Sequence, residues 1–194
     1  MNYYEPISVS PKPLTLEGHA NLYHTKKSKS NGQASFRLPL IIGEHIDPMV
    51  SKFFNRRGLY IRAAELFYSA PYRESLIHSD GNPNDYEITN DMAKINFISG
   101  GEDAIMNWYQ PKIEKPYTPT GKDNNFISFN PNEVMCVASD TITGYNIVQT
   151  GIPHNITTKS KSRYCVSLTL AIRNQAPKMI PYDTMISLLT STSQ

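Results

Sequence analysis

The feature that most constrains the fold of this sequence is a succession of eight short strand-like runs that begins at residue 59. Each run is rich in apolar, β-branched or aromatic residues, and turn residues separate most of them. The runs are 59–69, 73–79, 92–98, 104–110, 134–139, 144–149, 152–158 and 163–172. Eight short strands predict a mainly β fold, a jelly roll whose two sheets face each other around a central slot.

The 194 residues are expected to form one domain. Within it we expect an irregular N-terminal segment at 1–35, the jelly-roll core at 59–172 and a tail at 174–194. A short helix is predicted near 182–190 in this tail.

One helix before the core has clear boundaries. Asp47 suits the N-cap, Pro48 suits the first helical position, and Gly58 suits the stop after the last turn. The apolar residues between them recur at helical spacing. His45 and Asp47 also form a His-x-Asp motif, but this Asp is expected to serve as the cap, so we interpret the motif as unrelated to metal binding.

Three connecting segments carry predictions of their own. Turn residues at 99–103 predict a tight hairpin between the third and fourth strands. The segment 111–130 is long and polar and contains several prolines, which is typical of a lid or a binding loop. The basic segment 26–32 has two interpretations, a solvated loop or an arm that contacts phosphate groups.

Composition excludes few classes of function. Charged residues make up 19% and the net charge is +2, which neither requires nor excludes a nucleic-acid partner. No apolar run approaches about 18 residues, so no transmembrane helix and no membrane partner are predicted. Cys136 and Cys165 lie in apolar runs and are predicted to be buried thiols in a reducing compartment, which favours a cytoplasmic protein.

Two histidines and one carboxylate are the candidate metal ligands. His78 and Asp80 lie two residues apart at the end of the second strand, and His154 lies in the seventh. Two imidazoles and one carboxylate form the facial triad that holds non-haem Fe(II) with open coordination positions. Because His-x-Asp arises often by chance, the alternative interpretation is that the three are unrelated polar residues. Arg163, at the head of the last strand, strengthens the metal interpretation because a guanidinium binds a carboxylate through two hydrogen bonds.

These residues resemble the Fe(II)- and 2-oxoglutarate-dependent oxygenase superfamily, and most of all its small phage and bacterial members. The resemblance covers roughly residues 59–172 and includes the runs Ile95-Asn96-Phe97, Gly100-Gly101, Met106 and Trp108-Tyr109. It implies a double-stranded β-helix core, a cupin-like jelly roll, preceded by one or more helices. It also implies that His78, Asp80 and His154 bind Fe(II), and that Arg163 binds the distal carboxylate of 2-oxoglutarate.

The activity implied by the resemblance is a hydroxylation. Fe(II), 2-oxoglutarate and O2 would together oxidise a substrate C–H bond through an iron-oxo species, while 2-oxoglutarate is decarboxylated to succinate and CO2. One position departs from the family pattern. Many relatives carry Ser two residues after the Arg, where this chain has Cys165, with Ser167 further along.

The resemblance suggests further residues around the metal. Candidates for cosubstrate binding are Asn96, Tyr72 and Tyr109. Lys94 shares a strand face with Asn96 and is the alternative partner of the 2-oxoglutarate carboxylate. Candidates for substrate binding are Arg73 and Trp108. Each has a structural alternative: an outward-facing Asn, an aromatic residue of the core, or an Arg at the surface.

Several functions stay open on the sequence alone. The leading hypothesis is an oxygenase acting on a protein or peptide side chain, a free amino acid or another small metabolite. A nucleobase substrate has slight support from the basic run 159–163. The alternatives are a non-catalytic jelly-roll structural or binding protein, such as a virion component, and a cupin-like metalloprotein that does not use 2-oxoglutarate.

Overall fold

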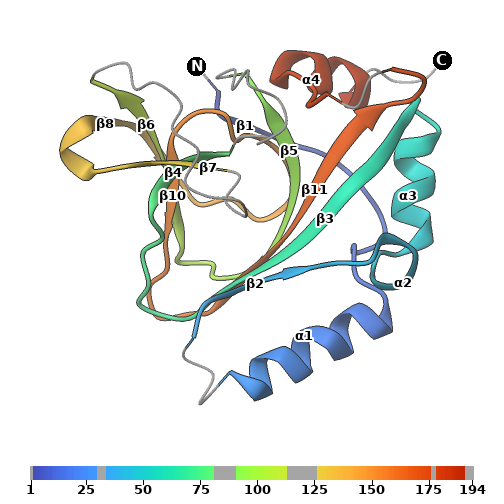
Figure 1. Cartoon of the computed structure of the whole chain (residues 1–194), viewed down its shortest axis with the longest axis horizontal. Helices are drawn as coiled ribbons and strands as arrows, with labels where there is room; N and C mark the ends of the chain where they lie inside the picture. Colours follow the sequence, from blue (N-terminus) through green and yellow to red (C-terminus); the bar gives the residue numbers. More distant parts are fainter. Residues whose placement is uncertain (1, 30–33, 81–90, 113–125, 176–177, 191–194) are drawn as a thin grey trace.

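The computed structural model describes residues 2–29, 34–80, 91–112, 126–175 and 178–190. Two sheets and several helices make up the fold (Figure 1). The helices are α1 (Leu16–Ser28), α2 (Ile42–His45), α3 (Pro48–Asn55) and α4 (Tyr182–Thr190), with a 3-10 turn at Pro131–Glu133. The strands are β1 (Tyr4–Pro6), β2 (Phe36–Pro39), β3 (Leu59–Ser69), β4 (Ile77–Asp80), β5 (Ala93–Gly100), β6 (Ile105–Pro111), β7 (Phe126–Phe129), β8 (Val134–Asp140), β9 (Gly144–Gln149), β10 (His154–Thr157) and β11 (Arg163–Ile172).

The chain crosses repeatedly between the two sheets. The large sheet has the order β1-β9-β5-β11-β3-β2, and the small sheet has the order β7-β4-β10-β6-β8. All strand pairs are antiparallel. From β3 to β11, leaving β7 aside, the chain places β3, β5, β9 and β11 in one sheet and β4, β6, β8 and β10 in the other. This is the predicted jelly roll, in the arrangement of a double-stranded β-helix.

Strand alternation divides the side chains of the large sheet between two environments. Along β11, Tyr164, Val166 and Leu168 join the apolar core that the sheet forms with the helices. Cys165 points the other way, into a second core between the sheets. In Figure 1, α1, α2 and α3 run alongside β2 and β3, while α4 lies near the end of β11. The helices therefore cover the outer face of the large sheet, and its inner face is left for the slot.

The helix predicted at 48–57 is confirmed. Asp47 Oδ1 accepts a hydrogen bond of 2.8 Å from Met49 N and so caps α3. Gly58 follows the helix with φ +72°, a conformation that favours glycine. The His45 side chain also binds the local backbone, because its Nδ1 accepts a hydrogen bond from Ile41 N. The second His-x-Asp motif thus serves the local backbone.

Three expectations about local structure are wrong. The segment 1–35 is not irregular, because Thr15 caps α1 and Lys26 and Lys27 lie in its last turn. The turn at 99–103 is not a hairpin, since β5 and β6 belong to different sheets. Cys136 is exposed, because it lies on β8 at the edge of the small sheet, whereas Cys165 is buried as predicted and both thiols are free.

Other expectations fall partly outside the described residues. The strand β7 occupies the end of the predicted loop 111–130, and residues 113–125 are not described. The helix expected near 182–190 is present as α4. Within the described ranges, no helix has both the length and the apolar character needed to span a membrane.

Candidate metal centre

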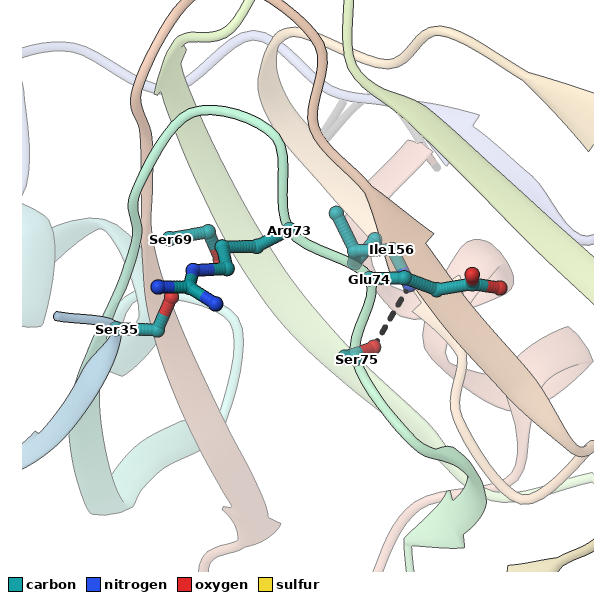
Figure 2. Close-up of a pocket in the computed structure, with 6 residues that line it drawn as sticks. All are labelled: Ser35, Ser69, Arg73, Glu74, Ser75 and Ile156. Carbon is teal, nitrogen blue, oxygen red and sulfur yellow. Dashed lines mark hydrogen bonds between the residues drawn. The ribbon is translucent and has the colours of Figure 1, made fainter. Parts of the chain in front are cut away.

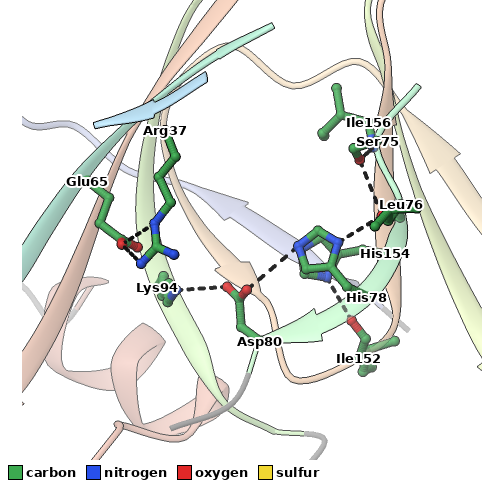
Figure 3. A network of polar contacts seen from close by, with 10 residues as sticks. All are labelled: Arg37, Glu65, Ser75, Leu76, His78, Asp80, Lys94, Ile152, His154 and Ile156. Atoms are coloured by element: carbon green, nitrogen blue, oxygen red, sulfur yellow. Dashed lines mark hydrogen bonds and ion pairs between the residues drawn. The ribbon is translucent and has the colours of Figure 1, made fainter. Parts of the chain in front are cut away.

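Two neighbouring strands of the small sheet bring the three candidate ligands together. His154 on β10 lies directly opposite His78 on β4. Because residues two apart on a strand share a face, Asp80 points to the same side as His78. One ligand atom from each of the three residues lies within 4.8 Å of the others. The predicted triad is therefore a cluster in space (Figure 3).

Backbone carbonyl groups fix the orientation of both imidazoles. His78 Nδ1 lies 2.8 Å from Leu76 O, and His154 Nδ1 lies 2.8 Å from Ile152 O. A carbonyl only accepts, so Nδ1 donates in each case and Nε2 keeps a lone pair for a metal. His78 Nε2 lies 3.7 Å from Asp80 Oδ1, which places these two candidate ligand atoms on the same side.

Burial keeps His154 neutral. Its pKa is lowered to about 4, chiefly because its surroundings exclude water and further because His78 lies beside it. The two imidazole rings are 4.6 Å apart between centroids. A neutral imidazole is the form that binds metals, so His154 is in the protonation state that a metal ligand requires near neutral pH.

Lys94 holds the carboxylate of the cluster. Its Nζ lies 2.9 Å from Asp80 Oδ2, and both side chains are largely buried. Burial alone would raise the pKa of Asp80, but the charge of Lys94, with smaller contributions from the imidazoles of His154 and His78, outweighs it and holds this pKa well below its usual range. Burial would likewise lower the pKa of Lys94, yet Asp80 and Glu65 together raise it. Asp80 is therefore ionised, with Oδ2 bound to Lys94 and Oδ1 directed toward His78.

A second ion pair lies close to Lys94. Arg37 on β2 donates two hydrogen bonds to Glu65 Oε1 on β3. Figure 3 shows the Arg37–Glu65 pair beside the Lys94–Asp80 pair. Sequence reasoning did not assign Glu65 or Arg37 to the site. The available signal was a lone Glu within the apolar run 59–69, because a half-buried carboxylate requires a partner.

Arg163 lies buried at the head of β11, with 5% of its surface exposed. It pairs with Ser69 on one side and Gly100 on the other. A Cβ at Gly101 would lie 2.6 Å from Arg163 Cβ, so the turn between β5 and β6 needs glycine where it covers this arginine. Alternation places Arg163 on the same face of β11 as Cys165, toward the slot.

The guanidinium of Arg163 has no carboxylate partner among the described residues. Burial lowers its pKa, and the neighbouring sulfur of Cys165 offsets this only in part. A buried charge is costly unless it is paired, so this position favours an anion that binds from outside the chain.

The remaining predicted residues divide into two groups. Asn96 and Trp108 are buried on the inner side, where Asn96 Oδ1 and Trp108 Nε1 find no hydrogen-bond partner in the described part of the chain. The structure does not bring Tyr109 or Tyr72 to the cluster. Tyr109 donates to Asn155 Oδ1 on the opposite face of β10 from His154, and Tyr72 is 78% exposed. Arg73 lines a separate pocket beyond the end of β3.

Two nitrogens and one carboxylate oxygen suit a divalent transition metal of the first row. Imidazole binds zinc, copper, iron and nickel well, and the combination of two His and one carboxylate is typical of non-haem Fe(II). Carbonyl groups already hold the imidazoles and Lys94 already holds the carboxylate, as is usual around metal ligands. The residues present therefore fit a metal of this class.

No family model and no curated protein matches the chain. Among solved structures, HygX from Streptomyces hygroscopicus with nickel and 2-oxoglutarate bound is 11% identical, with a TM-score of 0.44, covering 82% of this chain and 78% of HygX. The viral collagen prolyl hydroxylase vCPH from Paramecium bursaria Chlorella virus-1, in a 2-oxoglutarate complex, is 12% identical, with a TM-score of 0.43, covering 87% and 95%.

A third similar structure is E. coli ycfD, which is 15% identical with a TM-score of 0.36. The match covers 66% of this chain but only 28% of that protein. All three likenesses are distant, so the ligands of this chain have to be inferred from its own residues.

Proposed function

We propose that this chain is an Fe(II)- and 2-oxoglutarate-dependent oxygenase, a single domain that hydroxylates a C–H bond of its substrate. The observation that carries the proposal is the cluster of His78, Asp80 and His154 in one slot with a buried arginine that lacks a described counter-ion. A metal accounts for the cluster, and an acidic cosubstrate accounts for Arg163. A purely structural jelly roll requires neither.

In this proposal each residue of the cluster has a defined role. His78 and His154 present Nε2 to the metal, because their Nδ1 atoms are committed to backbone carbonyls. Asp80 presents Oδ1, because Lys94 holds Oδ2. Bound Fe(II) would supply the activation of O2, coupled to decarboxylation of 2-oxoglutarate to succinate.

Arg163 is proposed to bind the distal carboxylate of 2-oxoglutarate through its guanidinium. The apolar residues of the inner core would exclude water from the reaction, among them Ile98, Met106 and Val148. Lys94 is paired with Asp80, which supports Arg163 over Lys94 as the carboxylate partner.

The proposal is tested by anaerobic titration of the purified protein with Fe(II) and then 2-oxoglutarate. The expected result is a weak visible charge-transfer band that requires both components. His78→Ala is expected to lose metal binding. Arg163→Met, which keeps an unbranched side chain beneath Gly101, is expected to keep the metal and lose the 2-oxoglutarate-dependent band. His19→Ala is the matched control, because His19 is exposed on α1.

The result also separates the competing functions. A protein that retains no metal would refute the oxygenase and leave a binding or structural role. A metal-loaded protein that neither binds 2-oxoglutarate nor forms succinate from it would favour the cupin-like alternative.

A further inference from the structure

A pocket of about 300 Å³ lies next to the proposed metal centre but is not part of it. Its lining consists of Ser35, Ser69, Arg73, Glu74, Ser75 and Ile156 (Figure 2). Two of these residues connect it to the centre. Ser69 pairs with Arg163 at the end of β3, and Ile156 follows His154 by two residues on β10.

The segment that forms one wall of this pocket is firmly attached to the end of β10. Thr158 is buried, and its hydroxyl donates to Ala70 O at 2.6 Å and accepts from Arg73 N at 3.0 Å. Thr158 N donates to Arg73 O at 2.7 Å, and Ser75 N donates to Ile156 O at 2.9 Å. The backbone around Arg73 is therefore fixed before any ligand binds, which lowers the entropic cost of binding.

Hydrogen-bond donors are in excess in this pocket. Ser35 Oγ accepts from Ala70 N at 3.2 Å, and Ser75 Oγ accepts from Ile156 N at 2.9 Å. Each hydroxyl hydrogen is left to donate, since the contact of Ser75 Oγ with Leu76 O is long at 3.4 Å. Ser69, which has no hydrogen bond to any described side chain, contributes a third hydroxyl.

The two charged side chains of the lining, Arg73 and Glu74, point in different directions. In Figure 2 the guanidinium of Arg73 reaches toward Ser35, while the carboxylate of Glu74 points away from it. Glu74 is already bound, since its Oε1 accepts from Asn155 Nδ2 at 2.9 Å. No described carboxylate forms an ion pair with Arg73. Within the described residues, the pocket therefore combines an arginine that has no ion-pair partner with hydroxyl donors.

We propose that this pocket is an oxyanion site that binds a carboxylate or phosphate group through Arg73 and the hydroxyls of Ser35, Ser69 and Ser75. A guanidinium fork with flanking hydroxyls matches the planar, acceptor-only surface of such a group. The site adjoins the position assigned to 2-oxoglutarate, because Ser69 pairs with Arg163, but Arg163 is not part of its lining. It does not depend on the proposed oxygenase activity.

The test follows the backbone amide signals of Ser35, Ser69 and Ser75 by NMR in the metal-free protein. Inorganic phosphate and acetate are titrated separately at constant ionic strength, because a phosphate ester and a carboxylic acid carry these two groups. Saturable shifts of these amides with either probe support the site, and the tighter probe identifies the source of the anion. Arg73→Gln is expected to weaken binding about tenfold or more, as a lost charged hydrogen-bond pair would. Ser69→Ala is expected to weaken it a few-fold.

Arg173→Gln is the matched control, because it removes the same charge from an exposed arginine elsewhere. Equal weakening by Arg73→Gln and Arg173→Gln would show general charge attraction and overturn the proposal. Absence of saturable shifts in the wild-type protein would also overturn it. No metal is added, so each result is independent of the oxygenase assay.

Discussion

Replacing Lys94 by Met tests whether the charge on Asp80 is what holds this site together. Lys94 Nζ lies 2.9 Å from Asp80 Oδ2, and the two side chains are only 13% and 19% exposed. Removing one partner of a buried ion pair leaves the other charge without compensation and costs about 3–5 kcal/mol. Since both side chains keep some contact with solvent, we expect the metal-free Lys94→Met protein to lose about 2–4 kcal/mol of its free energy of unfolding.

Metal is expected to offset part of this loss. A divalent cation at His78, Asp80 and His154 supplies the positive charge that Lys94 provided. In the variant, this cation is also not repelled by a lysine bound to the same carboxylate. We expect Mn(II), as a redox-stable substitute, to stabilise Lys94→Met more than wild type by at least about 1 kcal/mol, which is about a fivefold tighter Kd. Urea unfolding with EDTA and with saturating Mn(II) measures both quantities.

Lys161→Met is the control for this experiment. Lys161 also forms an ion pair, with Glu102 at 3.1 Å, but those side chains are 60% and 63% exposed. Exposed pairs contribute little, so this substitution should leave the urea midpoint nearly unchanged. Equal losses in the two variants, or no greater effect of Mn(II) on Lys94→Met, would refute the reasoning.

Four further substitutions, one of them a control, test the surrounding structure, and each is measured by urea unfolding. Tyr72 has φ +55° and an exposed ring, so Tyr72→Gly should stabilise the protein by about 0.5–1 kcal/mol, and a loss would show that the ring makes a needed contact. Gly101→Ala should cost about 2 kcal/mol or more, because φ is +61° and the added Cβ would lie 2.6 Å from Arg163 Cβ. Gly43→Ala, with no atom within 4 Å of the added Cβ, should be near neutral, and similar values for both glycines would contradict the packing argument. Asp47→Ala should cost about 1 kcal/mol by removing the cap of α3, and an unchanged midpoint would show that the cap is dispensable.

Local patterns predicted the parts of the fold that depend on neighbouring residues. The ranges 59–69, 144–149 and 163–172 coincide with β3, β9 and β11, because strand composition and turn residues are properties of the local chain. Helix α1 was not predicted, because its local sequence carries no detectable helical pattern. Its buried residues are Gly18 and Leu22, too few to form an apolar stripe that periodicity could detect.

Pairing between distant strands could not be predicted in this way. Two glycines with positive φ, Gly100 and Gly101, make a sharp turn. No pattern in the sequence around this turn indicates that the next strand belongs to the other sheet. The direction in which Tyr109 points also depends on contacts between distant segments. Trp108 and Tyr109 are adjacent aromatic residues, and only one of them can face inward. Packing of Trp108 between the sheets, against the rings of Tyr3 and Tyr4, decides which one does.

The candidate site contains features of both kinds, those set by neighbouring residues and those set by pairing between distant strands. Each histidine is oriented by a carbonyl two residues earlier in the sequence, just before its strand begins, so a short sequence carries both the ligand and its support. The carboxylate is different, because Lys94 on β5 holds Asp80, Glu65 on β3 stands near Lys94, and Arg37 on β2 holds Glu65. These residues come from distant segments, and alternation along each strand shows only which face they occupy. A motif can therefore identify the metal ligands, whereas the charges that keep Asp80 ionised and oriented depend on how the sheets assemble.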